Sequence, residues 1–134
     1  MKKTKDFNPN ISPVGWYVAS LVERFEFYDE DIASANHRCE AWENLVLIKA
    51  ETPDEAYRKV VALGKLHNRS EMWTPAGRKG AWRFEGISSL LPVYEELEDG
   101  AEIRWTKHQN KAVKTIKAKV KRKAQLEAFR KNLP

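Results

Sequence analysis

Residues 43–65 read ENLVLIKAETPDEAYRKVVALGK, and this stretch sets out a strand, a tight turn and a helix in one piece. The run Leu45–Ile48 is wholly apolar, which is typical of a strand covered on part of both faces. Thr52 then stands where an N-cap belongs, and Pro53 occupies the first helical position, where its missing N–H costs nothing. Glu55 follows Thr52 by three residues and predicts a capping box.

The helix that begins at Pro53 is predicted to be amphipathic. The residues that share its apolar side are Ala56, Tyr57, Val60, Val61 and Leu63. Gly64 follows the last of them and predicts the end of the helix, because glycine is the usual residue just past a helical C-terminus. We therefore expect one capped helix that covers one face of a sheet.

Strands are predicted on both sides of this helix. Residues 14–27 alternate aromatic and β-branched types with smaller ones, and 41–50 should return antiparallel to them. A third strand runs from about Ala81 to Pro92, where Gly86 predicts a bulge or a close backbone approach. A fourth strand is expected at 101–106, from its alternating apolar residues. The order β-β-α-β-β-α predicts an α+β, two-layer fold with a four-stranded, mainly antiparallel sheet and a basic C-terminal helix.

The chain is long enough for one domain with an appendage. We expect an irregular lead-in at 1–13, an α+β domain at 14–106 and a basic amphipathic helical tail at 107–134. Residues 28–40 read as a polar connection, and 66–80 read as a loop. Within the tail, the apolar residues that fall on one helical stripe are Val113, Ile116, Val120 and Ala124.

The charge is divided unevenly. The net charge is +5, but residues 107–134 hold ten basic residues and one acidic residue, a net +9, which leaves −4 for residues 1–106. Such asymmetry points to contact with a polyanion or with the protein's own acidic surface. Cys39 is the only cysteine, so no disulfide forms within the chain. No apolar run is long enough for a membrane span or a secretory signal, and we expect a cytoplasmic protein.

Four sequence segments together resemble a bacterial family of unknown function. They are the opening Gly-Trp-Tyr-Val-Ala at 15–19, the strand Glu-Asn-Leu-Val-Leu-Ile-Lys-Ala at 43–50, the helix start Thr-Pro-Asp-Glu-Ala at 52–56, and Trp-Arg-Phe-Glu-Gly-Ile at 82–87. The resemblance covers about 14–106 and implies a compact bacterial domain. It implies no catalytic residues, because the activity of that family is not established. The polar segment at 28–40 and the basic tail depart from the shared pattern.

The basic tail is the most distinctive functional feature. Lysines presented on several sides of a helix can neutralise phosphates and release counterions. Arginine and aromatic residues are scarce there, so any nucleic-acid contact should tolerate any sequence. The residues predicted to bind nucleic acid or another polyanion are Lys111, Lys114, Lys117, Lys119, Lys121, Arg122 and Lys123. Two alternatives stay open: the helix docks on its own domain with its lysines in water, or it pairs with a second copy.

A protein interface is the second prediction. Met72 and Trp73 lie in a stretch that reads as a loop, where an exposed tryptophan could anchor a partner. The other aromatic residues read more readily as core or cross-strand pairs than as a ligand pocket. On this hypothesis the protein is an interaction module, for instance an antitoxin-like, immunity-like, phage-defence or regulatory partner, with no nucleic-acid role.

The sequence supports no catalytic or metal site. His37, Cys39, His67 and His108 lack the spacing of zinc ligands, and Cys39 lacks the surroundings of a catalytic thiol. The acidic clusters at 29–31 and 95–99 read as solvated carboxylates that could attract the basic tail. No phosphate-binding glycine loop or nucleophile elbow is present. We expect a protein that is not an enzyme, binds no metal or cofactor, and engages nucleic acid, an acidic protein surface, another protein partner or a second copy, but no membrane.

Overall fold

The computed structural model describes residues 7–29, 36, 38–68, 71–73 and 77–129, with the backbone alone at 71–73. The elements are β1 (Trp16–Phe27), β2 (Ala41–Lys49), α1 (Pro53–His67), β3 (Glu71–Trp73), β4 (Lys79–Pro92), α2 (Val113–Lys117) and two 3-10 turns, η2 (Lys123–Gln125) and η3 (Glu127–Phe129). Contacts within the chain divide it into two units, Met1–Arg104 and Trp105–Pro134.

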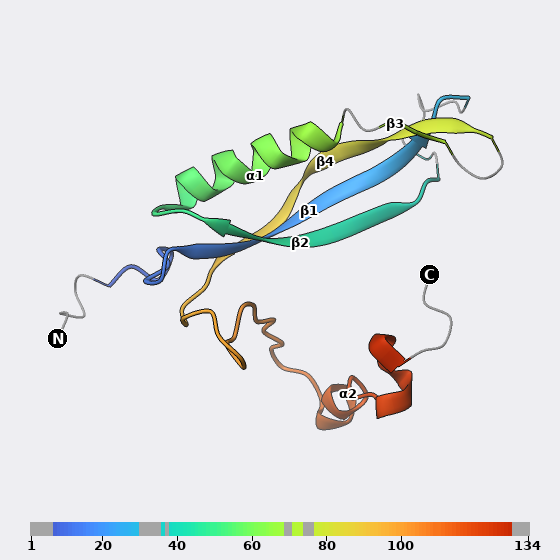
Figure 1. The fold of residues 1–134 in the computed structure, drawn as a ribbon. Helices are drawn as coiled ribbons and strands as arrows, with labels where there is room; N and C mark the ends of the chain where they lie inside the picture. The colour runs from blue at the N-terminus through green and yellow to red at the C-terminus, as the bar shows by residue number, and fades with distance from the viewer. Residues whose placement is uncertain (1–6, 30–35, 37, 69–70, 74–76, 130–134) are drawn as a thin grey trace. The chain divides into compact units, whose positions relative to one another are not determined.

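The first unit is an antiparallel sheet with one helix. Three long strands form the sheet, β3 adds three residues at one edge, and the strand order is β2-β1-β4-β3. α1 lies along one face of the sheet (Figure 1). The predicted α+β arrangement, an antiparallel sheet with one main helix, is confirmed. The short β3 falls inside the stretch 66–80 that the sequence predicted to be a loop.

The strand predicted at 101–106 is wrong, because those residues form no regular structure. The chain leaves the sheet at Val93 instead of turning back along β4. The Val93 N–H donates to the Trp16 carbonyl, and the Val93 carbonyl accepts from the Ser12 hydroxyl. Val93 itself is buried. These contacts direct the chain across the start of β1, so the alternating residues of 101–106 find no neighbouring strand to pair with.

The start of α1 forms largely as predicted. Pro53 is the first helical residue, and the Thr52 hydroxyl oxygen accepts from the Glu55 N–H at 3.1 Å. The second half of the predicted capping box differs by one residue. The Glu55 carboxylate accepts from the N–H of Glu51 at 2.7 Å, not from that of Thr52. The cap therefore fastens the turn between β2 and α1 as well as the helix end.

The end of α1 corrects the interpretation of Gly64. The helix continues past Gly64 to His67, and Gly64 is one of its three buried residues, with Ala56 and Val60. These three fall at i, i+4 and i+8, so they form the stripe that faces the sheet. A Cβ at Gly64 would lie 2.5 Å from ring atoms of Phe84 on β4. Glycine is therefore needed there for close approach of helix and strand, not for a helix stop.

The core lies between α1 and the sheet. Ala19 and Leu21 of β1 and Val60 of α1 are fully buried. The partly buried residues that pack around them are Val46, Ile48, Leu63, Phe84, Ile87 and Leu90. Tyr57, predicted to share the apolar side of α1, is 55% exposed, because the buried stripe of this helix is narrow.

β4 reaches this core through two irregularities in its pairing with β1. The register shifts between Ser20 and Leu21 and again between Val22 and Glu23. Each shift leaves one β4 residue, Ser88 or Glu85, without an opposite partner on β1. Gly86 lies between them with a φ of 152°, a conformation that side chains rarely adopt. The bulge predicted at Gly86 is therefore present, and it accompanies a second one.

The basic amphipathic helix predicted at 107–134 does not form within the described residues 107–129. α2 spans five residues, and two three-residue turns follow it. The physical reason lies in the sequence. Like charges stand four residues apart at Lys117 and Lys121 and at Lys119 and Lys123, and they repel along a helix. Ala112 at the N-cap provides no side-chain hydrogen bond. A short helix without a buried face is marginal in water.

Candidate functional site

The residues predicted to bind a polyanion all lie in the second unit. Lys114 and Lys117 belong to α2, Lys123 begins η2, and the other four lie in the connections before and between these elements. All seven side chains are exposed. Among the described residues, none of them forms an ion pair with a carboxylate. Glu127 is the single acidic residue between 105 and 134. The segment therefore offers a dense set of cations with a single carboxylate side chain in its own unit.

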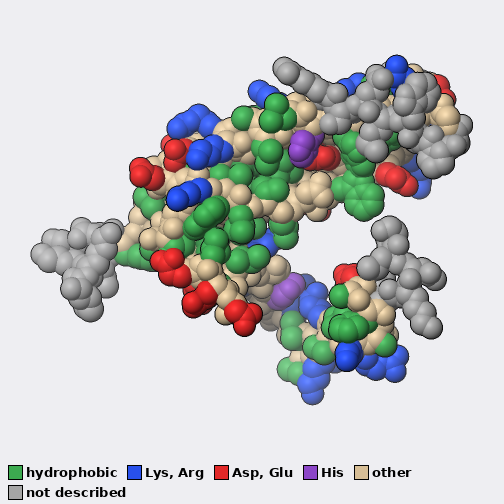
Figure 2. Space-filling model, in the orientation of Figure 1, with side chains coloured by type: hydrophobic (Ala, Val, Ile, Leu, Met, Phe, Trp, Pro, Cys, Tyr) green, Lys and Arg blue, Asp and Glu red, His purple; other side chains and the backbone are tan. Residues whose placement is uncertain are grey.

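The second unit presents these cations around short turns. In Figure 2, Lys and Arg side chains surround the part of the chain that carries α2 and the two 3-10 turns. A hollow of about 530 Å³ is lined by Ala118, Val120, Lys121, Ala124 and Gln125. The Lys123 ammonium lies 5.1 Å from the centroid of the Phe129 ring, and this aromatic residue is 54% exposed. An exposed ring beside lysines is the arrangement on which a nucleic-acid base can stack.

The apolar stripe predicted for the tail does not form, because it requires a continuous helix. Val113, Ile116 and Val120 are 69%, 42% and 80% exposed. Because α2 ends at Lys117, Val120 lies beyond the helix and leaves the helical phase of the other two. The docking and pairing alternatives for the tail stay predictions.

The predicted protein interface at Met72 and Trp73 is placed only by its backbone. Both residues belong to β3, where Met72 is opposite Gly80 and Trp73 is opposite Lys79. Their side chains lie outside the described part of the structure. The interface at these two residues therefore stays a prediction.

The aromatic residues of the strands form a cross-strand cluster, as their spacing suggested. Phe25 lies 4.9 Å from Phe27 and 5.3 Å from Trp82, between ring centroids, and Trp82 lies 6.2 Å from Trp42. Three strands therefore contribute rings to the same face of the sheet. This arrangement supports packing as the role of these side chains.

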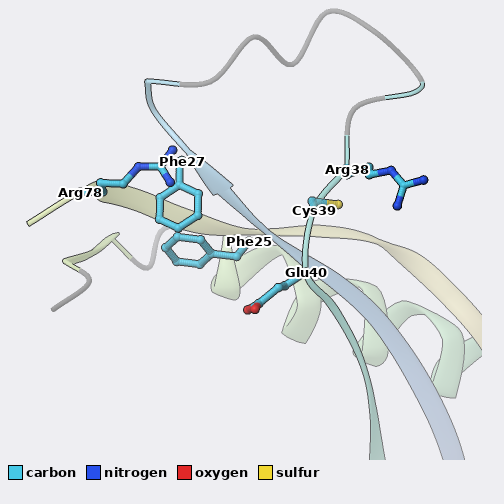
Figure 3. A pocket seen from close by; sticks show the side chains of 6 residues that line it. All are labelled: Phe25, Phe27, Arg38, Cys39, Glu40 and Arg78. Carbon is cyan, nitrogen blue, oxygen red and sulfur yellow. The ribbon is translucent and has the colours of Figure 1, made fainter. Parts of the chain in front are cut away.

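A pocket of about 400 Å³ adjoins this cluster, and no sequence pattern indicated it. The residues that line it are Phe25, Phe27, Arg38, Cys39, Glu40 and Arg78. In Figure 3 the Arg78 side chain lies beside the Phe27 ring, whereas Arg38 points away from both rings. The two guanidinium groups therefore do not converge on one point, as a site for a single anion would require. The end of β1, residues 38–40 and residue 78 line the pocket together. They are far apart in the sequence, and the pairing of the strands brings them close.

Arg78 is committed to structural contacts at the rim of this pocket. Its guanidinium carbon lies 3.8 Å from the centroid of the Phe27 ring. Two of its nitrogens donate to the two carboxylate oxygens of Asp29, at 2.7 and 3.1 Å. These hydrogen bonds hold the pKa of Asp29 below its usual value. In the same way, the Glu26 carboxylate raises the pKa of Arg83 on the neighbouring strand. Arg83 therefore joins β4 to β1, and Arg78 joins the residues that flank the ends of these two strands.

The histidines and the cysteine are dispersed. His67 Nδ1 lies 2.6 Å from the buried carboxylate of Glu23, which joins the end of α1 to β1. Cys39 is exposed, and His108 is exposed in the second unit. His37 lies outside the described residues. Within the part of the chain that the structure covers, no three His, Cys, Asp or Glu side chains gather as metal ligands would.

One carboxylate of each acidic cluster has a local partner. The Glu95 carboxylate accepts from the N–H of Glu102 at 3.1 Å, and Asp29 pairs with Arg78 as described. Glu30 and Asp31 lie outside the described residues. In the described portion, every fully buried side-chain nitrogen or oxygen has a hydrogen-bond partner. No buried polar group there is left aimed at a substrate.

Comparison with known proteins yields a family and nothing more specific. No curated protein and no solved structure matches the chain significantly. Of the helices that the structure describes, none has the length and apolar character to cross a membrane. A family profile described as a domain of unknown function matches residues 16–105, which is the range from β1 to just beyond the first unit. This match confirms the resemblance drawn from the four sequence segments. The chain belongs to the DUF4288 family, a domain of unknown function.

Proposed function

We propose that the protein is a small, non-catalytic bacterial binding module of the cytoplasm, whose basic C-terminal segment engages nucleic acid without sequence preference. The basic segment comprises residues 111–123. The observation that carries the proposal is its seven exposed cations, which share their unit with one carboxylate side chain, that of Glu127. The first unit carries a net −4 through residue 106, so the cationic surface is local and does not reflect a basic protein as a whole.

The form of the segment favours phosphate contact over base reading. Lysine acts as a mobile point charge, whereas base recognition relies mainly on the planar fork of arginine or on amide side chains. Short turns on an extended chain can follow a phosphate backbone without a fixed docking geometry. Phe129 offers one stacking surface for an unpaired base, which favours single-stranded over double-stranded nucleic acid.

The test measures binding of the full-length chain to generic single- and double-stranded oligonucleotides across a salt series. A triple variant, K117Q/K119Q/K121Q, removes three segment charges. Each lysine that contacts a phosphate contributes roughly 0.7–0.9 to the slope of log affinity against log salt. We expect the triple variant to bind more weakly and to lower that slope by about 2–3.

A matched control removes three exposed charges from the first unit. The variant R58Q/K65Q/R104Q changes the net charge of the protein by the same amount. It should leave affinity and salt slope close to those of the unchanged chain. Equal losses in both triple variants, or binding that ignores salt, would rule out a local basic interface.

A protein-interaction module, such as an antitoxin-like or regulatory partner, is the second candidate. The observation that favours it is the exposed edge strand β2, seven of whose nine residues are exposed. Failure of all oligonucleotides to bind at low salt would favour this candidate. Pull-down experiments would then compare Leu45→Lys, which changes the β2 edge, with Trp73→Ala, which changes the interface predicted from the sequence.

A further inference from the structure

β2 is a long edge strand with an apolar centre. In the sheet that the structure describes, it pairs with β1 alone, from Ala41 to Lys49, and that pairing runs without a register shift. Leu45 and Leu47 are 53% and 44% exposed. Natural edge strands are usually protected by proline, bulges, inward charges or short length. β2 has none of these from residue 44 to 48. At its ends, the Glu43 carboxylate accepts from the Ser88 hydroxyl at 2.8 Å and the Lys49 carbonyl accepts from the Lys59 ammonium. The centre of the strand is therefore able to accept another strand.

The opposite edge of the sheet is covered over residues 79–84. β3 pairs with the first residues of β4, at 79–81. Beyond it, the Asn68 side chain accepts from the Phe84 N–H at 2.6 Å, and the Asn68 carbonyl accepts from Arg83. The end of α1 therefore shields that edge.

The hydrogen bonds between β1 and β2 show which β2 groups face outward. The Phe25 N–H donates to the Glu40 carbonyl, and the Ala50 N–H donates to the Gly15 carbonyl. Hydrogen-bonded pairs alternate along an antiparallel ladder. The even-numbered residues of β2 therefore bond to β1, and the N–H and C=O groups of residues 43, 45, 47 and 49 point away from it. In agreement, the Lys59 ammonium reaches the Lys49 carbonyl from α1 at 2.7 Å.

The β2 residues whose N–H and C=O groups point away from β1 also have side chains that can pair with those of an identical strand. Glu43, Leu45, Leu47 and Lys49 share one face of the strand, because side chains alternate with a period of two. Two copies of β2 placed antiparallel, with Val46 opposite Val46, bring Glu43 of each copy opposite Lys49 of the other. The same register places Leu45 opposite Leu47 twice. A shift of the partner by two residues in either direction loses both charge pairs.

We propose that the β2 edge binds a second copy of this chain, in the antiparallel register centred on Val46. The two sheets then continue into one, with the α1 helices on the same face. Hydrogen bonds between backbones provide the affinity of such strand addition, and facing side chains provide its specificity. The proposal does not depend on the nucleic-acid function, because none of residues 111–123 of the basic segment takes part in it.

The charge pattern provides the first test, by analytical ultracentrifugation of nuclease-treated full-length protein. The unchanged chain should sediment as a dimer. E43K places lysine opposite lysine, and K49E places glutamate opposite glutamate, at two symmetric positions each. We expect each single variant to weaken the dimer by about tenfold or more. The double variant E43K/K49E restores opposite charges and should restore the dimer. A purely monomeric unchanged chain would overturn the proposal.

Disulfide trapping provides a second test, which reads the register directly. Cys39 is first replaced, to give C39S/V46C and C39S/N44C. Residue 46 meets its own counterpart across the axis at a non-hydrogen-bonded pair, where Cα atoms lie about 4.5 Å apart. That distance suits a disulfide. Residue 44 meets residue 48 instead, so its variant serves as the matched control.

We expect mild oxidation to cross-link C39S/V46C and to leave C39S/N44C as monomer on a non-reducing gel. Circular dichroism of both variants establishes that each is folded before oxidation. Cross-linking at residue 44 in preference to residue 46 would contradict the register. A dimer that persists unchanged in both single charge variants would place the contact elsewhere on the molecule.

Discussion

Gly64 shows how a missing side chain can be part of the packing. It is buried in α1, and a Cβ there would lie 2.5 Å from the Phe84 ring. Helix propensity alone favours alanine over glycine by about 1 kcal/mol in a helix interior. Packing opposes that preference, because the bulky ring of Phe84 on β4 occupies the space that a Cβ at residue 64 would need. At this residue the contact with Phe84 decides whether a change to alanine raises or lowers the free energy of unfolding.

We therefore predict that Gly64→Ala destabilises the protein by about 1–3 kcal/mol, which is the usual cost of overpacking. Urea denaturation followed by circular dichroism measures it. The control is Phe84→Leu, which makes room at the same contact. In that background Gly64→Ala should cost less than it does alone. A stabilising effect of Gly64→Ala in the unchanged chain would mean that α1 and β4 approach less closely than described.

Gly64 also marks a limit of sequence interpretation at this scale. A glycine at the end of an apolar periodic run has two physical uses, as a helix stop and as a point of close approach. The pattern of residues 53–65 fits both. Only the position of Phe84, which is twenty residues further along the chain, distinguishes them. Local periodicity contains no information about that distant ring.

At the scale of elements, the joint between β2 and α1 was predictable because its chemistry is local. Thr52, Pro53 and Glu55 act within one turn, and the structure places the first two as expected. β4 was harder to interpret. Phe84, Ile87 and Leu90 share the core face although they are three residues apart. A spacing of three is typical of a helix, and the two register shifts produce it here in a strand.

The N-cap of α1 predicts that the Thr52 hydroxyl contributes measurably to the free energy of unfolding. Thr52→Ala removes the oxygen that accepts from the Glu55 N–H, and we expect a loss of about 1 kcal/mol in the free energy of unfolding. Thr52→Ser keeps an acceptor at the same place and should lose much less. Chemical denaturation of the two variants beside the unchanged chain makes the comparison. Equal losses in both would show that the methyl group matters more than the hydrogen bond.

The C-terminal segment failed as a predicted helix for a reason that also acts at this scale. Its apolar residues have helical spacing, and that spacing alone indicated the helix. Spacing does not include the repulsion between lysines four residues apart or the weak N-cap at Ala112. The charged residues themselves were correctly expected to be exposed. The candidate site was thus predictable by composition and not by conformation.

For the whole molecule, the division into two units predicts how stability is distributed. Every fully buried hydrophobic residue in the described structure lies between Tyr17 and Val93. All described residues after Ala101 are exposed. The buried core that the structure describes therefore lies in the first unit.

We predict that a chain ending at Thr106 unfolds with nearly the same thermal midpoint as the full-length chain. A shift below about 4 °C, equivalent to less than about 1 kcal/mol, is expected. Differential scanning calorimetry in high salt makes the comparison, because salt screens long-range attraction between the acidic domain and the basic segment. A loss well above that shift would show that residues 107–134 pack against the domain.

The paired bulges of β4 have a consequence for how the length of this strand can change. From Tyr17 to Phe27, eleven residues of β1 lie opposite thirteen residues of β4, from Gly80 to Pro92. Glu85 reverses the facing of the strand once and Ser88 reverses it back. Removing one of them would turn half of the strand inside out, with its core residues toward water, whereas removing both would preserve every facing. β4 should therefore tolerate insertions or deletions of an even number of residues, because these leave each side chain on its original face of the sheet. What selection has to maintain is whether the number of residues in β4 is odd or even, and not the length itself.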